Sequence, residues 1–569
     1  MSGPQSRDID WGAGATGTVA ADAGNGKESQ ATAIVRLAHE NGVDLWHTPA
    51  GDGYITLPVT GHQEHHLLAS RGTRDYLTRL FYVDCGKAPN SNALQAAIAT
   101  LSGTARFDGD EHEVHVRVGG RPGHIYLDLG DPAWRAVEVT PAGWQIVTKP
   151  PIRFRRPRGM LPLPVPVRGG SLTELRRFVN VASQEDFVLV AMWQIQALRP
   201  VGPYPILVMI AEQGAAKTTT AKVLRRLCDP NASDVRRPPR NTQDLMIAAT
   251  NGHVVAFDNL SRLPGDLSDN LAVLATGGGF SVRELYANRE EVLFHAQRPI
   301  ILNGISQVAT RGDLLDRAIV ITLPPIPDAR RKDEATFWQD FDVAHPRILG
   351  VLLDAVSSGL KRLPDVQLAR KPRMADFAMW SVAAEPACPW SPGAFLEAYA
   401  ANRQGAVEST LDGDPVADVV RALAPWSGTA TELLTELNTR TDEAITRRKD
   451  WFSRPRQVAD ALRRIAPGLR KVGLDVDFVR HGRGRTRLIE IVRLDSSAAS
   501  AASAPSAGPD SGGDRMDAGG DGPSPSSARS SADQGHVLGG ADAADAADAV
   551  KRHFLDEEID GLTEFEERI

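Results

Sequence analysis

Residues 206–218 read ILVMIAEQGAAKT, an apolar run followed by a short loop that ends in lysine and threonine. The apolar run predicts a buried strand, and the next residues, TTTAKVLRRL (218–227), predict a helix directly behind the loop. In a strand, loop and helix of this order, backbone N–H groups and the positive end of the helix face an anion. This stretch therefore predicts an α/β fold with a phosphate-binding loop, or P-loop.

The loop supplies the residues expected to bind ATP, and two of them have specific roles. Lys217 brings a positive charge to the β- and γ-phosphates, and the Thr218 hydroxyl is a candidate ligand of Mg²⁺. The consensus loop has glycine where this chain has Ala211 and Ala216, and Ala216 is the stronger departure because the residue before the lysine lies close to the phosphates. A chance match is the alternative, which the flanking strand and helix disfavour. The expected nucleotide-binding residues are Glu212, Gln213, Gly214, Ala215, Ala216, Lys217, Thr218 and Thr219.

Two further apolar strands end in polar residues that suit the same site. VVAFD (254–258) ends in Asp258, which is expected to hold the Mg²⁺ ion, and RPIILN (298–303) ends in Asn303, a candidate sensor of the γ-phosphate. A second acid often follows such an aspartate, but Asn259 stands here and cannot accept a proton. We therefore expect slow hydrolysis or a base elsewhere, with three carboxylates as alternatives: Asp266, Asp269 and Glu212.

An arginine directly precedes the last apolar strand, AIVITL (318–323). Arg317 is predicted to reach the nucleotide of a neighbouring subunit, where a guanidinium can stabilise charge on a transferring phosphoryl group. Ion pairs with Asp313 or Asp316 are the alternative, and this applies to Arg311 as well. The expected catalytic residues are Lys217, Asp258, Asn303 and Arg317.

The order of these motifs resembles the AAA+ ATPase core of superfamily III helicases, and more closely the phage- and plasmid-type primase–helicase proteins of bacterial mobile elements. The resemblance covers residues 170–330, and residues 415–495 more loosely. It implies a nucleotide site built from Lys217, Thr218, Asp258, Asn303 and Arg317 in a homo-oligomeric ring.

The same resemblance implies a β-hairpin over residues 280–294 that projects into the pore of the ring and touches DNA. The segments SVRELY and EVLF read as two short strands around a polar turn. Arg283 and Arg289 are therefore candidate DNA contacts. Three nearby glutamates, Glu284, Glu290 and Glu291, make a solvated hairpin face the alternative.

Residues 415–495 predict a winged helix, because helical patterns are followed by the strands LDVDFV (474–479) and RLIEIV (487–492). The net charge of the chain is −7, so binding to nucleic acid requires a local basic cluster of the kind found here. A protein-docking winged helix with solvated arginines is the alternative. The candidate nucleic-acid-binding residues of this region are Arg463, Arg464, Arg483 and Arg485.

The N-terminal region carries two weak motifs. Asp128 in LDLGD (127–131) is reminiscent of the paired acids of primase–polymerase domains, but Asp131 is offset from the face of the strand that pairing requires. HQEHH (62–66) lacks the spacing of a zinc site. We therefore assign this region no chemistry.

The chain also lacks features of secretion or membrane insertion. Three separated cysteines fit a reducing cytosol, the longest apolar runs are too short for a membrane span, and the start has no secretory signal, so a cytoplasmic protein is expected. The fold class is α/β, with an α+β N-terminal domain, a central AAA+ P-loop ATPase domain and a C-terminal winged-helix domain. The expected regions are 1–30, disordered; 31–169, mixed α+β; 170–335, ATPase core; 336–414, helical lid or connector; 415–495, winged helix; and 496–569, disordered acidic tail.

These features together predict an ATP- and Mg²⁺-dependent, helicase-like protein that processes single-stranded or forked DNA. The alternative is a nucleotide-gated regulator or loader that binds ATP and DNA without unwinding, which Asn259 favours.

Overall fold

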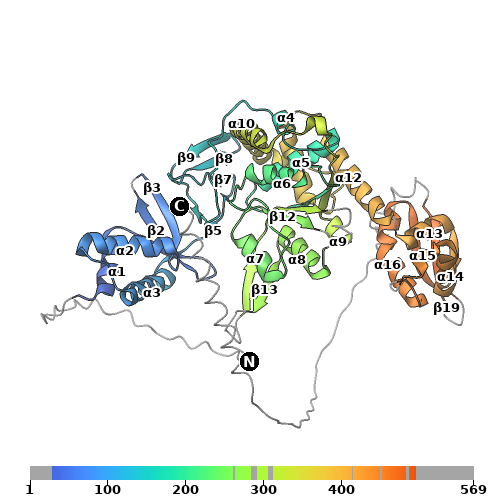
Figure 1. The fold of residues 1–569 in the computed structure, drawn as a ribbon, viewed down its shortest axis with the longest axis horizontal. Coiled ribbons are helices and arrows are strands. Elements are labelled where there is room, and N and C mark those ends of the chain that lie inside the picture. Colours follow the sequence, from blue (N-terminus) through green and yellow to red (C-terminus); the bar gives the residue numbers. More distant parts are fainter. Residues whose placement is uncertain are drawn as a thin grey trace, which may run out of the picture. The chain divides into compact units, whose positions relative to one another are not determined.

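The computed structural model describes residues 28–59, 61–260, 263–283, 291–304, 312–412, 414–448, 451–481 and 486–494 of the 569-residue chain (Figure 1). Several expectations lie outside these residues: the disordered N-terminus before residue 28, the acidic tail, and the side chains of Arg289, Arg311, Arg483 and Arg485.

The N-terminal part packs three helices against a four-stranded sheet of order β3-β2-β1-β4. Each helix contributes apolar side chains to its core, among them Ile34, Leu77 and Leu101, and the sheet contributes Ile55. The elements are α1 (Gln30–Glu40), β1 (Asp44–His47), β2 (Gly53–Val59), β3 (His62–Leu67), α2 (Arg71–Cys85), α3 (Ser91–Phe107) and β4 (Asp110–Glu111).

A second sheet follows, an antiparallel meander of order β6-β7-β8-β9. Its apolar face, which includes Leu127 and Val137, belongs to the same hydrophobic core as Leu207 of the central domain. Within the described residues, 31–169 therefore contribute to three buried apolar clusters, the third of which contains Tyr126, Ala136 and Phe154. The elements are β5 (Val114–His115), β6 (Val118–Arg121), β7 (His124–Asp128), β8 (Ala136–Thr140), β9 (Gly143–Val147) and β10 (Arg153–Phe154).

The central domain is built on a wholly parallel four-stranded sheet of order β12-β15-β11-β16, as expected for the α/β class. Alternate residues of β11 face opposite sides: Ile206 and Val208 pack with α7 and α8, whereas Leu207 and Met209 pack with α5 and α6. The elements are α4 (Leu172–Leu175), α5 (Gln184–Ala197), β11 (Ile206–Ile210), α6 (Lys217–Arg226), α7 (Thr242–Thr250), β12 (Val255–Leu260), α8 (Gly265–Thr276), β15 (Ile300–Gly304), α9 (Gly312–Leu315) and β16 (Ala318–Thr322).

A two-stranded hairpin is inserted between α8 and β15 at the predicted position. β13 (Gly279–Arg283) pairs antiparallel with β14 (Glu291–His295), and Arg283 stands opposite Glu291 at the described end. The turn that joins the strands lies outside the described residues. Of the two arginines expected to contact DNA here, the structure therefore describes only the backbone of Arg283.

Long helices follow the sheet. α10 (Glu334–Arg362) packs on β8 and β9, beside which it lies in Figure 1, and α11 (Ala375–Ala384) packs on α10. α12 (Ala394–Leu411) begins in the central core with Phe395 and ends with Leu411 in the C-terminal core. One continuous helix therefore belongs to both domains. Short 3-10 helices occupy Asp328–Arg330, Leu363–Asp365 and Glu385–Ala387.

The C-terminal part has helices followed by a hairpin, in the order that the sequence predicts. Its three-stranded antiparallel sheet has the order β17-β19-β18, and α16 covers it with Val458, Leu462 and Leu469. Its classification as a winged helix stays a prediction. The elements are α13 (Pro415–Leu423), β17 (Trp426–Gly428), α14 (Ala430–Arg440), α15 (Glu443–Thr446), α16 (Pro455–Lys471), β18 (Leu474–His481) and β19 (Thr486–Arg493).

Among the residues that the structure describes, no helix combines the length and the apolar character needed to cross a membrane.

Candidate functional site

The predicted P-loop joins the end of β11 to the start of α6. Ala216, the residue before the lysine, has φ 57° and ψ 32°, which is the left-handed conformation that glycine adopts most easily. Gly214 also has a positive φ, of 81°. Among the residues that the structure describes, no side chain caps α6, so its first N–H groups receive no side-chain acceptor there. The partial positive charge at this end of the helix is therefore left for another anion.

Lys217 folds back along the loop. Its Nζ donates to the carbonyl oxygens of Ala211, at 2.5 Å, and Glu212, at 2.8 Å. The side chain of Glu212 is exposed at this point. Backbone carbonyls thus hold the ammonium group at the loop, where its charge favours an anion.

Three of the predicted side chains meet beside the loop. The Thr218 hydroxyl donates to Asp258 Oδ2 at 2.7 Å, and Asn303 Nδ2 donates to Asp258 Oδ1 at 3.3 Å. Asn303 Nδ2 also lies 3.3 Å from the carbonyl oxygen of Lys217. The three residues come from α6, β12 and β15, and they meet because the carboxyl ends of parallel strands lie at one edge of the sheet.

The residues at this edge fit a magnesium-bound triphosphate. Carboxylate and hydroxyl oxygens, here of Asp258 and Thr218, are the ligands that Mg²⁺ prefers alongside water and phosphate oxygens. Asn303 is fully buried, and its Oδ1 accepts no hydrogen bond within the described part of the chain. A buried acceptor without a partner is costly, so a bound donor at this position would stabilise the site.

Two residues beside the loop were missed by sequence reasoning. Asn180, between α4 and α5, donates through Nδ2 to the carbonyl oxygens of Ala215, at 2.9 Å, and Pro324, at 2.7 Å. Arg331 lies after the last strand, and its Nη2 is 3.4 Å from the position that a Cβ on Gly214 would take. Asn180 therefore braces the loop. Arg331 places a guanidinium beside the loop while it pairs with Asp328 at 3.0 Å. Neither stands in a sequence pattern that points to a phosphate site.

Arg317 lies at the opposite edge of the sheet. Its carbonyl oxygen accepts from Ile206 N at the start of β11, whereas the P-loop follows the end of that strand. Five strand residues separate the two positions, which is about 16 Å. The Arg317 side chain forms an ion pair with Asp313, the alternative that the sequence left open. In this conformation Arg317 does not reach the P-loop of its own chain.

The residue after Asp258 is the uncharged Asn259, and its backbone is in the left-handed region. Asn259 is exposed, has φ 60°, and donates its backbone N–H to Asp258 Oδ1 at 2.9 Å. Asparagine tolerates the left-handed region better than most residues. It therefore fits the turn at this strand end, and it brings no base to the site.

A groove of about 740 Å³ lies between α16 and the β18–β19 hairpin. We call it the arginine groove, after the arginines of the described residues that line it, which are Arg456, Arg463, Arg480 and Arg487. Arg463 packs 4.4 Å from the centre of the Phe478 ring, and Asp460 pairs with Arg463 at 2.8 Å and with Arg456 at 3.7 Å.

The other two arginines of the groove face each other directly. Arg480 stands opposite Arg487 in the antiparallel register, and neither forms an ion pair with another described residue. Like charges directly opposite are destabilising, and a bound anion would relieve their repulsion. Of the two predicted DNA-binding arginines whose side chains the structure describes, Arg463 lines the groove. Arg464 is exposed on α16 outside its lining.

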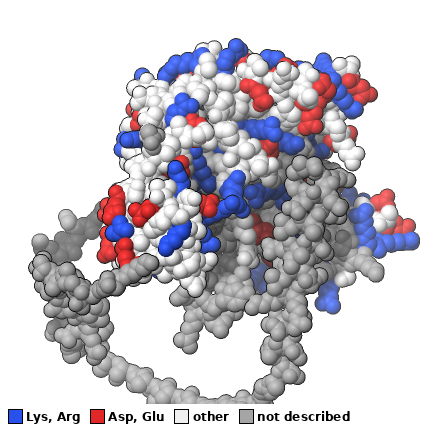
Figure 2. Space-filling view, turned by 60° about the vertical axis from the view of Figure 1, so that its left-hand side comes forward, with Lys and Arg blue, Asp and Glu red and all other residues white. Residues whose placement is uncertain are grey.

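Basic and acidic groups are interspersed over the face shown in Figure 2. A basic binding site must therefore come from a local cluster such as the arginine groove.

The weak N-terminal motif around Asp128 has a structural explanation, since the buried carboxylate of Asp128 accepts hydrogen bonds from Arg156 at 2.6 and 2.9 Å. No group of three or more His, Cys, Asp and Glu side chains within the described ranges could hold a metal ion.

Comparison with known proteins gives two family matches. Residues 172–404 match the model of the actinomycete integrative conjugative element replication protein, and residues 414–506 match that of the AICE RepA C-terminal domain. No curated protein matches the chain.

Two solved structures are remotely similar to this chain. The apo C-terminal region of NrS-1 is 10% identical with a TM-score of 0.37, over 83% of this chain and 100% of that chain. JCV helicase is 13% identical with a TM-score of 0.22, over 38% of this chain and 65% of that chain.

Proposed function

We propose that this chain, whose central and C-terminal domains match those of a replication protein of a conjugative mobile element, binds ATP with Mg²⁺ and hydrolyses it while processing DNA. The observation that carries the proposal is the convergence of Thr218, Asp258 and Asn303 beside the uncapped start of α6. A hydroxyl, a carboxylate and an amide at the carboxyl edge of a parallel sheet form a site for a phosphate chain.

Each residue has a role that follows from its contacts. Lys217 would exchange the carbonyl oxygens of Ala211 and Glu212 for phosphate oxygens, and Thr218 and Asp258 would hold the ion. When bound, Mg²⁺ neutralises charge on the phosphates. The Asn303 amide has both a donor and a free buried acceptor to orient a phosphate or a water. Asn180 would keep the loop in shape.

A ring of subunits is supported by the place of Arg317. A guanidinium at the edge opposite the P-loop serves no nucleotide of its own chain, but it can face that of a neighbour once it leaves Asp313. This arrangement, together with the β13–β14 hairpin, favours the superfamily III helicase type that the sequence resembles.

DNA, single-stranded or forked, is the proposed substrate of this activity. Its phosphates would bind in the arginine groove, where Arg480 and Arg487 repel each other without an anion. The groove also exposes aromatic surface at Phe478, on which a base can stack.

The test compares Lys217→Ala with Lys222→Ala, which removes the same charge from the same helix outside the loop. ATP binding and DNA-stimulated ATP hydrolysis are measured on one preparation of each protein. We expect Lys217→Ala to lower turnover by about 100-fold or more, the usual loss when a phosphate-binding charge is removed, and Lys222→Ala to change little. Equal hydrolysis by the two variants would refute the site.

A second candidate function is a nucleotide-gated DNA-binding regulator or loader. Asn259 favours it, because the position after Asp258 holds no carboxylate to activate water. Strand displacement on a forked duplex separates the two functions: a helicase unwinds the duplex in the presence of ATP, whereas a regulator binds both ligands and leaves the duplex paired.

A further inference from the structure

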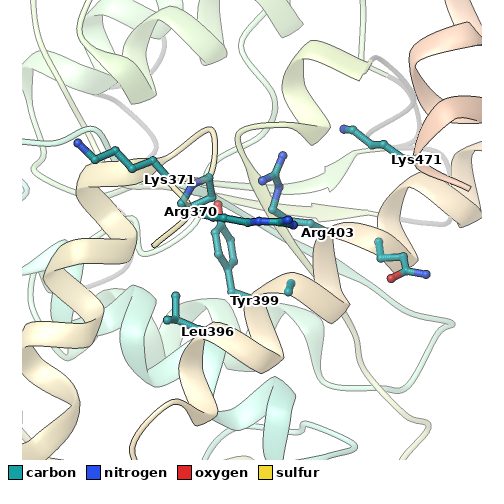
Figure 3. Close-up of a pocket in the computed structure, with 9 residues that line it drawn as sticks. Arg370, Lys371, Leu396, Tyr399, Arg403 and Lys471 are labelled. Carbon is teal, nitrogen blue, oxygen red and sulfur yellow. The ribbon is translucent and has the colours of Figure 1, made fainter. Parts of the chain in front are cut away.

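A basic pocket of about 400 Å³ lies on the central domain, at the joint with α16. We call it the Tyr399 pocket. Four cationic residues line it around that tyrosine: Arg370, Lys371, Arg403 and Lys471. They come from the loop before α11, from α12 and from the end of α16. In Figure 3 the ring of Tyr399 points from α12 toward the basic side chains.

Tyr399 brings an unused hydrogen-bond donor to this pocket. The residue is 2% exposed, and its hydroxyl has no hydrogen-bond partner among the described residues. Burial raises the pKa of this hydroxyl to about 12, so it carries its proton at neutral pH. A buried hydroxyl without a partner costs free energy that an acceptor in the pocket would recover. The Arg403 guanidinium lies 5.9 Å from the centre of the ring.

One carboxylate contacts two of the cations. Asp316 lies 2.8 Å from Lys471 Nζ and 3.5 Å from Arg403 Nη2. The lining carries four cationic side chains, and Asp316 supplies one negative charge to Arg403 and Lys471. The carboxylate also shows that Arg403 and Lys471 are placed to bind oxygen anions.

We propose that the Tyr399 pocket binds a phosphate group, carried by a nucleic-acid strand or by a free nucleotide. The Tyr399 hydroxyl donates to a phosphate oxygen, and Arg403 and Lys471 exchange Asp316 for the phosphate. Guanidinium and ammonium groups together with a hydroxyl donor match the several acceptors of a phosphate.

The position of the Tyr399 pocket suits a nucleic-acid strand that is also bound in the arginine groove. Lys471 follows Arg463 of the arginine groove by eight residues of α16, which is about 12 Å along the helix axis. A single strand that leaves the groove can therefore reach the pocket within a few nucleotides. In this form the inference rests on the proposed DNA processing and adds a second anchoring point to it.

Binding of a phosphate in the pocket would also affect Arg317, the residue after Asp316. Asp316 precedes Arg317, the arginine proposed to serve a neighbouring subunit. A phosphate that takes Arg403 and Lys471 from Asp316 releases the turn that carries Arg317 from α12 and α16.

The test uses the full chain without ATP and two substitutions in the pocket. Tyr399→Phe removes only the hydroxyl, and we expect it to weaken binding of a short labelled DNA strand by about 10-fold. The same variant should unfold at an equal or higher temperature, because it removes an unpaired buried group. Arg403→Gln should lower the salt dependence of strand binding by about 0.7, the value for one phosphate contact on a single strand. Arg440→Gln removes an exposed charge from α14 and serves as the control.

Inorganic phosphate and ATP, as competitors, distinguish the two sources. If millimolar phosphate or ATP competes with the labelled DNA strand, and Tyr399→Phe abolishes this competition, the pocket is a site for a free nucleotide. If Tyr399→Phe weakens only the binding of the DNA strand, the pocket is a site for the strand. Wild-type affinity of Tyr399→Phe for DNA, phosphate and ATP would overturn the inference. A Lys217→Ala background separates the two proposals: if that protein loses ATP but keeps the dependence on Tyr399, the pocket stands without the P-loop.

Discussion

Replacing Ala216 by glycine should stabilise the central domain, because Ala216 holds a conformation that is costly for a residue with a Cβ. Its φ of 57° and ψ of 32° lie in the left-handed region. This conformation costs such a residue about 1–2 kcal/mol, whereas glycine adopts it freely. Glycine loses more freedom on folding, about 0.5–1 kcal/mol, which offsets part of the gain. We expect Ala216→Gly to raise the free energy of unfolding by about 0.5–1 kcal/mol.

The adjacent alanine is the matched control, because the same substitution should have the opposite sign there. Ala215 is 1% exposed and is not among the residues with positive φ. Ala215→Gly removes a buried methyl group and adds freedom to the unfolded chain, a loss of about 1–2 kcal/mol. The same substitution of alanine by glycine at these two neighbouring positions should therefore change the free energy of unfolding in opposite directions.

Hydrogen exchange of the amides of β11 and α6 at increasing urea concentration measures this difference, because it reports the opening free energy of this part of the chain. ATP affinity is measured on the same samples. Ala216→Gly should bind ATP at least as tightly as the wild type, since a smaller residue stands next to Lys217. A lower opening free energy for Ala216→Gly, or a loss of ATP affinity, would refute the assignment of the loop.

Three further predictions concern polar and charged side chains. Arg117 is fully buried, with its Nε 3.2 Å from Asp229 Oδ1, and Arg225 is the second arginine paired with that carboxylate. Arg117→Met should lower the free energy of unfolding by about 3–5 kcal/mol in urea titrations, because it removes one of these two cations and the hydrogen bonds of Arg117 to three backbone carbonyl oxygens. Burial lowers the pKa of His253 to about 4 and of His345 to about 3, below the unfolded value of 6.5. Below pH 6.5 unfolding therefore takes up protons at these two histidines. The urea midpoint of unfolding should fall as the pH drops from about 6.5 to 4, and above pH 6.5 these histidines should not affect it. Asn180→Ala should weaken ATP binding by about 5- to 10-fold in a direct binding assay, because two hydrogen bonds that brace the loop are lost.

The meeting of Thr218, Asp258 and Asn303 could be predicted from the sequence, for a physical reason. Each residue follows or ends an apolar strand, and the carboxyl ends of parallel strands lie at one edge. Asn180 and Arg331 could not be found in this way. They approach the loop from segments far along the chain, and their contacts depend on how α5 and the end of the sheet pack.

The arginine groove shows the same limit. The number of arginines in residues 415–495 predicts a basic cluster near α16. It does not predict which of these arginines face one another. Arg480 and Arg487 come together through the register of the hairpin, a property of pairing rather than of composition. Arg464 follows Arg463 by one residue, which turns it about 100° around the helix and away from the groove.

The two sites described above are connected through the edge strand of the sheet. The side-chain amide of Asn402 on α12 accepts from Val320 N at 3.1 Å and donates to Val320 O at 2.6 Å, so it occupies the free edge of β16 as a further strand would. β16 pairs with β11, which leads into the P-loop, and its first residue follows Arg317. α12 also carries Tyr399 and Arg403 of the Tyr399 pocket. A shift of α12 on binding a phosphate would therefore act on β16 through two hydrogen bonds, and it would move Arg317 relative to the rest of the sheet.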